Sequence, residues 1–136
     1  MARVDARYQA GAESNCTSNM CCRHALPSTG TISDITVPAP LYGAYKCDSP
    51  YFLALAAMQA IGPLTGTSAQ NPPAFTLYTG DLVAHDPQNQ RSQAYVEYCE
   101  DTVWYMFKKY IGGPVYSALG VGDMLIPHSL PCLTLY

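Results

Sequence analysis

Apolar residues concentrate in the middle of the chain, and the first of these runs predicts a helix. Residues 51–61 are apolar almost all the way round, which predicts a helix that is buried on every side. Asp48 or Ser49 can cap the free N–H groups at its start, and Pro50 suits the first turn because no hydrogen bond is lost there. The Gly-Pro pair at 62–63 is expected to end this helix.

Three further elements are expected after a linker loop at 66–73. The short apolar run at 74–79 predicts a buried strand, and residues 88–110 predict a long helix that the glycines and proline at 112–114 end. Residues 115–119 predict a second buried strand. The inner stripe of the long helix is predicted to consist of aromatic and apolar residues: Tyr95, Tyr98, Val103, Trp104 and Phe107.

The alternation of helix and strand is typical of an α/β fold with parallel strands joined by right-handed crossovers. Ligands of such sheets bind beyond the carboxyl ends of the strands. Gly80-Asp81 follows the first predicted strand, and Gly120 follows the second. We therefore expect the chemistry of this chain at those two strand ends.

The chain is expected to have three parts. Residues 1–47 predict an irregular, cysteine-rich loop region, with one short β-prone piece at 32–37. Residues 48–123 contain the predicted α/β elements, and residues 124–136 predict an irregular tail.

Six cysteines in 136 residues are a high number. Four lie in the first third, where such a cluster indicates either disulfides in an oxidising compartment or a metal site: Cys16, Cys21, Cys22 and Cys47. A zinc cluster formed by these residues with His24 is the alternative to disulfides, although the paired CxxC spacing of zinc sites is absent. Cys99 and Cys132 are expected to be free thiols or small buried hydrophobic residues. Asn15-Cys16-Thr17 is a glycosylation sequon and favours a secreted protein.

Composition and charge exclude several classes of protein. Charged residues make up 12% of the chain, the formal net charge is −3, and no basic patch is present, which argues against nucleic-acid binding. No continuous apolar run is long enough for a transmembrane helix. The chain also opens without the apolar segment of a signal peptide, so we expect that an N-terminal part has been lost.

The segment 78–86 carries the most informative chemistry. Gly80 allows a tight turn after the strand, so that the carboxylate of Asp81 projects from the strand end, where it can bind divalent metal ions. His85 can supply a proton to a leaving group. The simpler interpretation is a Gly-Asp turn followed by a solvated loop histidine.

Four segments together resemble one family. They are similar to motifs of the acid sphingomyelinase branch of the calcineurin-like metallophosphoesterases, over residues 4–123. The matching patterns are Cys-x4-Cys-Cys-Arg at 16–23, Gly-x-Tyr-x-Cys-Asp-x-Pro at 43–50, Tyr-Thr-Gly-Asp-x-x-x-His-Asp at 78–86, and the strand at 113–120 that precedes a Gly-Asn-His motif.

The resemblance implies the first half of a metallophosphoesterase sandwich and a two-zinc phosphodiesterase that hydrolyses sphingomyelin to ceramide and phosphocholine. It implies Asp81 as a metal ligand, His85 as the proton donor to the leaving group, and Asp86 and Asp123 as supporting residues. It further implies the disulfides Cys16–Cys21 and Cys22–Cys47, and a secreted, lysosomal or vacuolar location.

The chain departs from the family pattern at most of the expected metal ligands. Met1 and Arg3 stand where the first motif has its aspartate and histidine, and Val121 and Gly122 replace an asparagine and a histidine of the third motif. We therefore expect hydrolysis to be lost or very weak, and an open sheet edge to favour self-association. An active phosphodiesterase, or a small secreted binding module held by disulfides that uses its tyrosines, are the alternatives.

Overall fold

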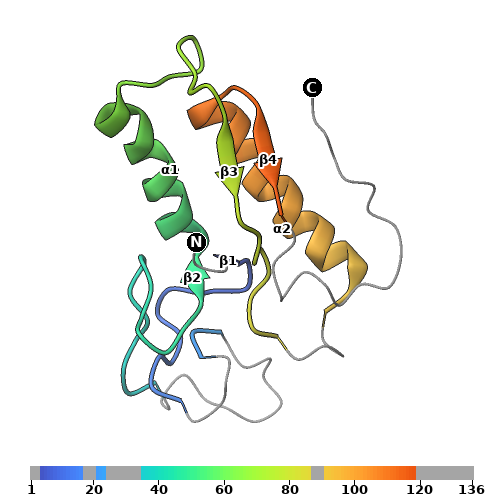
Figure 1. The fold of residues 1–136 in the computed structure, drawn as a ribbon. Coiled ribbons are helices and arrows are strands. Elements are labelled where there is room, and N and C mark those ends of the chain that lie inside the picture. The colour runs from blue at the N-terminus through green and yellow to red at the C-terminus, as the bar shows by residue number, and fades with distance from the viewer. Residues whose placement is uncertain (1–3, 17–20, 24–34, 87–90, 119–136) are drawn as a thin grey trace.

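The computed structural model describes residues 4–16, 21–23, 35–86 and 91–118 (Figure 1). Several predictions fall outside the described residues, namely those on Met1, Arg3, His24, Gly120, Val121, Gly122, Asp123, Cys132 and the tail at 124–136.

The described part is a small α/β fold, as the alternation predicts, but it has two short sheets where the sequence predicts one. Both sheets are pairs of parallel strands, β1 with β2 and β3 with β4. The elements in chain order are β1 (Val4–Asp5), β2 (Ser49–Pro50), α1 (Tyr51–Thr65), β3 (Thr76–Tyr78), α2 (Gln93–Met106), the π-helix η3 (Phe107–Ile111) and β4 (Val115–Ser117).

Helix α1 is longer and more exposed than its sequence predicts. It passes through Pro63 and runs to Thr65, so the predicted end at residues 62–63 is wrong. The end is set instead by Gly66, which adopts the left-handed conformation (φ 72°) and donates its backbone N–H to the Gly62 carbonyl at 2.9 Å. Met58 is the buried residue of the helix, while Leu64 is 83% exposed. The prediction of a helix buried all round is therefore wrong, because one side of α1 faces the core and the described chain does not cover the others.

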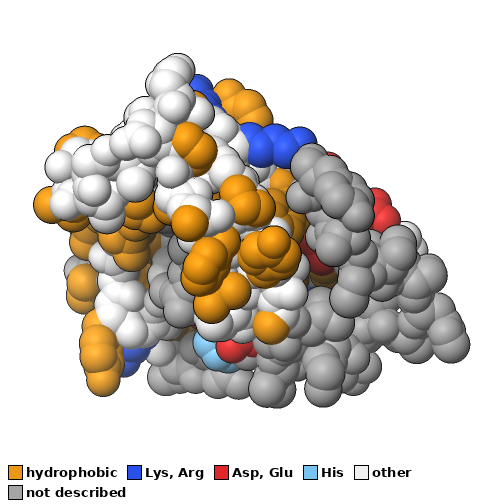
Figure 2. All heavy atoms as spheres, turned by 45° about the horizontal axis from the view of Figure 1, so that its top comes forward, with side chains coloured by type: hydrophobic (Ala, Val, Ile, Leu, Met, Phe, Trp, Pro, Cys, Tyr) orange, Lys and Arg blue, Asp and Glu red, His pale blue; other side chains and the backbone are white. Residues whose placement is uncertain are grey.

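Strands β3 and β4 pair in parallel, with Leu77 opposite Tyr116. The predicted parallel pairing is confirmed, but the predicted burial is wrong. Tyr78 points into the core, whereas Leu77 and Tyr116 are 68% and 56% exposed. Figure 1 shows α2 behind the two strands and α1 beside them, and Figure 2 shows hydrophobic side chains gathered on the surface over these elements. One face of the sheet is thus packed, and the other is apolar but exposed.

Helix α2 begins at Gln93, after Ser92, whose side-chain oxygen accepts a hydrogen bond from the Tyr95 N–H at 3.2 Å. The described chain just before it, at Arg91 and Ser92, is not helical, so the prediction of a helix from residue 88 is too long. The inner stripe also differs from the prediction, since Tyr98 is 60% exposed. The buried positions recur at spacings of three and four residues: Val96, Cys99, Val103 and Met106. The helix then continues as η3, and the predicted stop at Gly112 is confirmed.

One main core joins the helices to the strands. Its buried members are Val4, Met58, Tyr78, Leu82, Val83, Val96, Val103, Met106, Phe107 and Ile111. Cys99 is an unpaired, buried thiol beside this core, and burial raises its pKa to about 11. The thiol is therefore neutral at ordinary pH, as a small hydrophobic residue would be.

Two disulfides and a small buried cluster that contains Cys21, Cys22 and Ala39 hold the N-terminal region. Cys16–Cys21 and Cys22–Cys47 are both formed, which confirms the predicted pairs. The alternative zinc cluster is excluded for these cysteines because their sulfur atoms are consumed in disulfides.

Glu13 holds the backbone of the N-terminal region at Asn15, Thr36 and Val37. Its carboxylate accepts hydrogen bonds from the backbone N–H groups of Thr36, Asn15 and Val37, and these bonds lower its pKa to about 2. The described part of the β-prone piece, residues 35–37, forms no strand, and pairing there is limited to the isolated bridge between Glu13 and Pro38.

Candidate functional site

The turn after β3 has an unusual backbone at the predicted metal ligand. Gly80 and Asp81 both adopt positive φ angles, 80° and 64°. A left-handed conformation is uncommon for residues other than glycine, and aspartate is among those that tolerate it best. Asp81 is half-buried at this strand end.

The chain beyond this turn runs alongside β1. The backbone N–H of Val4 donates to the Leu82 carbonyl at 3.2 Å, and Val4 forms a parallel bridge with Val83. Because β1 also pairs with β2, this contact brings His85 next to the residue that precedes β2, which is Asp48.

His85 and Asp48 form a tight pair. One carboxylate oxygen of Asp48 lies 2.6 Å from Nδ1 of His85, and the other accepts the backbone N–H of His85 at 2.7 Å. An ionised carboxylate only accepts hydrogen bonds, so Nδ1 carries the proton and Nε2 is left to meet another partner. The side chain of His85 is 61% exposed while that of Asp48 is 12% exposed. The imidazole is thus fixed at one nitrogen and accessible from solvent.

The role of Asp48 was missed from the sequence, which suggested a helix cap. The structure records no side-chain cap at the start of α1, whose N-cap is Pro50 in an extended conformation. The signal that could have revealed Asp48 is its place in the segment that resembles the family, where an aspartate follows directly after a cysteine.

Asp86, the predicted supporting residue, belongs to a buried ion-pair cluster. Arg23 donates from Nε and Nη2 to Asp5 at 2.8 and 2.7 Å, and from Nη1 and Nη2 to Asp86, the latter at 3.1 Å. Both carboxylates have no exposed side-chain surface. Burial alone would raise the pKa of Asp86, but the Arg23 guanidinium outweighs it and lowers that pKa. The carboxylate of Asp86 is therefore held as an anion, and Arg23 binds both it and Asp5.

Two further arginines tie this cluster to α2. Arg91 donates from Nε to the backbone carbonyl of Asp86 at 2.7 Å. Arg7 lies 3.5 Å from the Asp86 carboxylate, and its guanidinium stacks over the Tyr95 ring at 4.3 Å. Asp86 thus anchors the loop that carries His85.

The described residues do not fit a two-zinc centre. Within 4–16, 21–23, 35–86 and 91–118, no three His, Cys, Asp or Glu side chains converge on one point. Of the predicted site residues, His85 and Asp86 are engaged with Asp48 and Arg23. A bridged pair of metal ions needs several converging donors.

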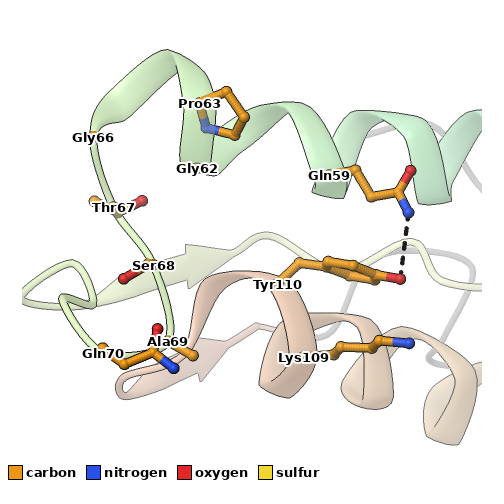
Figure 3. Close-up of a pocket in the computed structure, with 10 residues that line it drawn as sticks. All are labelled: Gln59, Gly62, Pro63, Gly66, Thr67, Ser68, Ala69, Gln70, Lys109 and Tyr110. Carbon is orange, nitrogen blue, oxygen red and sulfur yellow. Dashed lines mark hydrogen bonds between the residues drawn. The ribbon is translucent and has the colours of Figure 1, made fainter.

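A separate pocket lies at the opposite end of α1 from Asp48. It has a volume of about 620 Å³, and Figure 3 shows its lining from α1, the following loop and η3. Across it, Gln59 donates from Nε2 to the Tyr110 hydroxyl at 3.4 Å. None of the predicted site residues lines this pocket.

No protein-family model matches the chain. Curated proteins do match, and two of them are sphingomyelin phosphodiesterases. Human sphingomyelin phosphodiesterase is 30% identical over 129 residues, which cover 93% of this chain and 19% of that protein. This chain is distantly similar to part of sphingomyelin phosphodiesterase. The bovine sphingomyelin phosphodiesterase is also 30% identical, over 118 residues that cover 85% of this chain and 17% of its own length.

The chain spans about a fifth of the length of the sphingomyelin phosphodiesterases that it matches. The similarity nevertheless extends over nearly all of the chain, so it includes both disulfides and the turn after β3. In the described residues, no helix is long and apolar enough to cross a membrane.

Proposed function

We propose that this chain carries the proton-donor side of a sphingomyelin phosphodiesterase-like site, and that by itself it hydrolyses phosphodiesters very weakly or not at all. The Asp48–His85 pair carries this proposal. Relation to sphingomyelin phosphodiesterase makes a phosphodiester lipid the expected substrate class, with ceramide and phosphocholine as the products.

His85 is suited to general acid catalysis. When the bond between phosphorus and the leaving oxygen breaks, negative charge develops on that oxygen, and a proton from Nε2 of a protonated imidazole neutralises it. Asp48 holds Nδ1 and so fixes the plane of the ring that donates the proton. This arrangement needs the exposed nitrogen to face the substrate, which the accessibility of His85 supports.

The metal side of the site is the part expected to fail. Zinc bound at Asp81 would polarise the phosphoryl group in a complete site. Among the described residues Asp81 belongs to no group of three or more side chains that could hold a metal ion, and sequence positions 121 and 122 carry valine and glycine. We therefore propose that this chain does not bind two zinc ions side by side.

A turnover assay tests the proposal. The full chain is incubated with sphingomyelin vesicles and with bis(p-nitrophenyl) phosphate, with and without zinc, beside Asp81→Ala, His85→Ala and the exposed control Asp101→Ala. We expect turnover at or near background, no dependence on zinc, and no difference between Asp81→Ala and the unchanged chain. Calorimetry is expected to show no tight binding of two zinc ions. Zinc-dependent hydrolysis that Asp81→Ala abolishes would contradict the proposal.

The finer structural expectations belong to the same proposal. The α1–β3–α2–β4 unit is the first half of a metallophosphoesterase sandwich, with the division between the loop region and this unit after Cys47. Secretion and glycosylation at Asn15 are supported by two disulfides and by the exposed position of Asn15.

A binding module without catalysis is the second candidate. One observation favours it, which is the exposure of Tyr42 and Tyr45 in the disulfide-held region, at 57% and 103%. Exposed tyrosines are common in protein-binding surfaces because one end of the ring is apolar and the other is polar.

A further inference from the structure

One disulfide joins the two cysteines that directly precede the residues holding the loop of His85. Arg23, which binds Asp86, follows Cys22, and Asp48, which binds His85, follows Cys47. Cys22 and Cys47 are bonded to each other, with their Cα atoms 6.0 Å apart. The two anchoring side chains therefore start from neighbouring, covalently joined points of the backbone.

The two halves of this disulfide are held differently. The backbone N–H of Cys22 donates to the Glu13 carbonyl at 2.9 Å, and its carbonyl accepts the N–H of Gln9 at 2.8 Å. Cys22 is fully buried and is thus fixed to the N-terminal region. The N–H of Cys47 donates within its own turn, to Ala44 at 3.0 Å. The covalent bond transmits the fixed position of Cys22 to Cys47, and hence to the next residue, Asp48.

We propose that the Cys22–Cys47 disulfide is a positioning device for the His85 imidazole, and that its reduction releases the ring from Asp48. A dithiol reductant supplies two electrons and two protons, which convert the bond into two thiols while the reductant closes into its own disulfide. The covalent tie between Cys22 and Cys47 is then gone, and Asp48 loses one of the ties that place it. The inference rests on the proposed function only in naming His85 as the proton donor.

The neighbouring disulfide supplies a matched control. Cys16–Cys21 spans five residues in sequence, compared with 25 for Cys22–Cys47. Cys21 is followed by Cys22 rather than by a residue that anchors the loop of His85. Loss of this bond is expected to leave the His85 ring in place.

Imidazole ¹⁵N resonances of the full chain report the tautomer of His85, assigned with a His85→Gln variant. In the unchanged chain and in C16S/C21S we expect the proton on Nδ1, bound to Asp48. In C22S/C47S we expect a shift toward the Nε2–H form that a free imidazole favours, with circular dichroism and Trp104 fluorescence unchanged. A folded C22S/C47S variant that keeps the Nδ1–H signature would overturn the inference.

A reciprocal measurement keeps the inference testable if C22S/C47S does not fold. Coupling between two sites acts equally in both directions. The chain with the printed sequence and its Asp48→Asn variant are equilibrated in buffers with graded ratios of reduced to oxidised dithiothreitol. The free thiols are then alkylated and located by mass spectrometry. In Asp48→Asn, Cys22–Cys47 is expected to be half reduced at a ratio of reduced to oxidised dithiothreitol that is lower by about fivefold or more. The ratio at which Cys16–Cys21 is half reduced is expected to stay the same. Equal reducibility of Cys22–Cys47 in both chains would refute the coupling, and neither measurement depends on turnover.

Discussion

At the scale of single residues, two buried carboxylates depend on one guanidinium. Asp5 lies in β1 and Asp86 lies after the turn that follows β3, and Arg23 reaches both from the disulfide-held region. A buried charge is costly unless a partner of opposite charge and full hydrogen bonding accompany it. Arg23 meets this need for both side chains at once, so its ion pairs join β1 and the segment after β3 to the disulfide-held region.

Arg23→Ala is expected to destabilise the chain by about 3–5 kcal/mol, because it leaves two buried carboxylates without their main cation. Urea unfolding followed by the fluorescence of Trp104 measures the change. Lys108→Ala, an exposed control, is expected to lie within about 0.5 kcal/mol of the unchanged chain. If Arg23→Ala were as stable as Lys108→Ala, the cluster would not contribute to folding.

At the scale of elements, the start of α2 shows how a local signal and a tertiary contact combine. Ser92 caps the helix through Tyr95, and the Tyr95 ring is covered by Arg7 from the N-terminal region. The preceding residue, Arg91, binds the Asp86 carbonyl. The position at which the helix begins is thus connected to the loop of the candidate site.

Ser92→Ala removes the side-chain acceptor of the cap and is expected to cost about 1 kcal/mol of stability. Thermal unfolding monitored by circular dichroism measures it, with the exposed Ser117→Ala in β4 as the control. An unchanged midpoint for Ser92→Ala would show that the contacts of Arg91 and Arg7 define the helix start without the cap.

At the scale of the whole molecule, the described chain leaves much apolar surface in contact with solvent. Three residues are each more than half exposed: Phe75 just before β3, Leu77 in β3 and Tyr116 in β4. Contiguous exposed apolar patches are typical of interaction surfaces and of aggregation sites. The self-association expected from an open sheet edge therefore also has an exposed sheet face to draw on.

Sedimentation velocity over a broad concentration range tests this expectation. The unchanged chain is expected to self-associate as its concentration rises, and Leu77→Lys is expected to shift it toward the monomer, because a charge on this face opposes burial. Leu64→Lys is the control, since Leu64 is 83% exposed but lies at the end of α1, away from the sheet. Equal association of the two variants would place the contact elsewhere.

The sequence by itself did not predict β1 and β2. It did predict the order of α1, β3, α2 and β4, the parallel pairing of β3 with β4 and, through the family resemblance, the two disulfides. These features depend on short-range periodicity, turn residues or local motifs. The tertiary structure alone decided that Asp48 meets His85 across 37 positions and that Arg23 meets Asp86 across 63. It also decided which faces of α1, β3 and β4 are buried, because an apolar run has the same pattern whether or not another layer covers it. Long-range contacts depend on how separate elements pack, and a pattern of near neighbours does not record that.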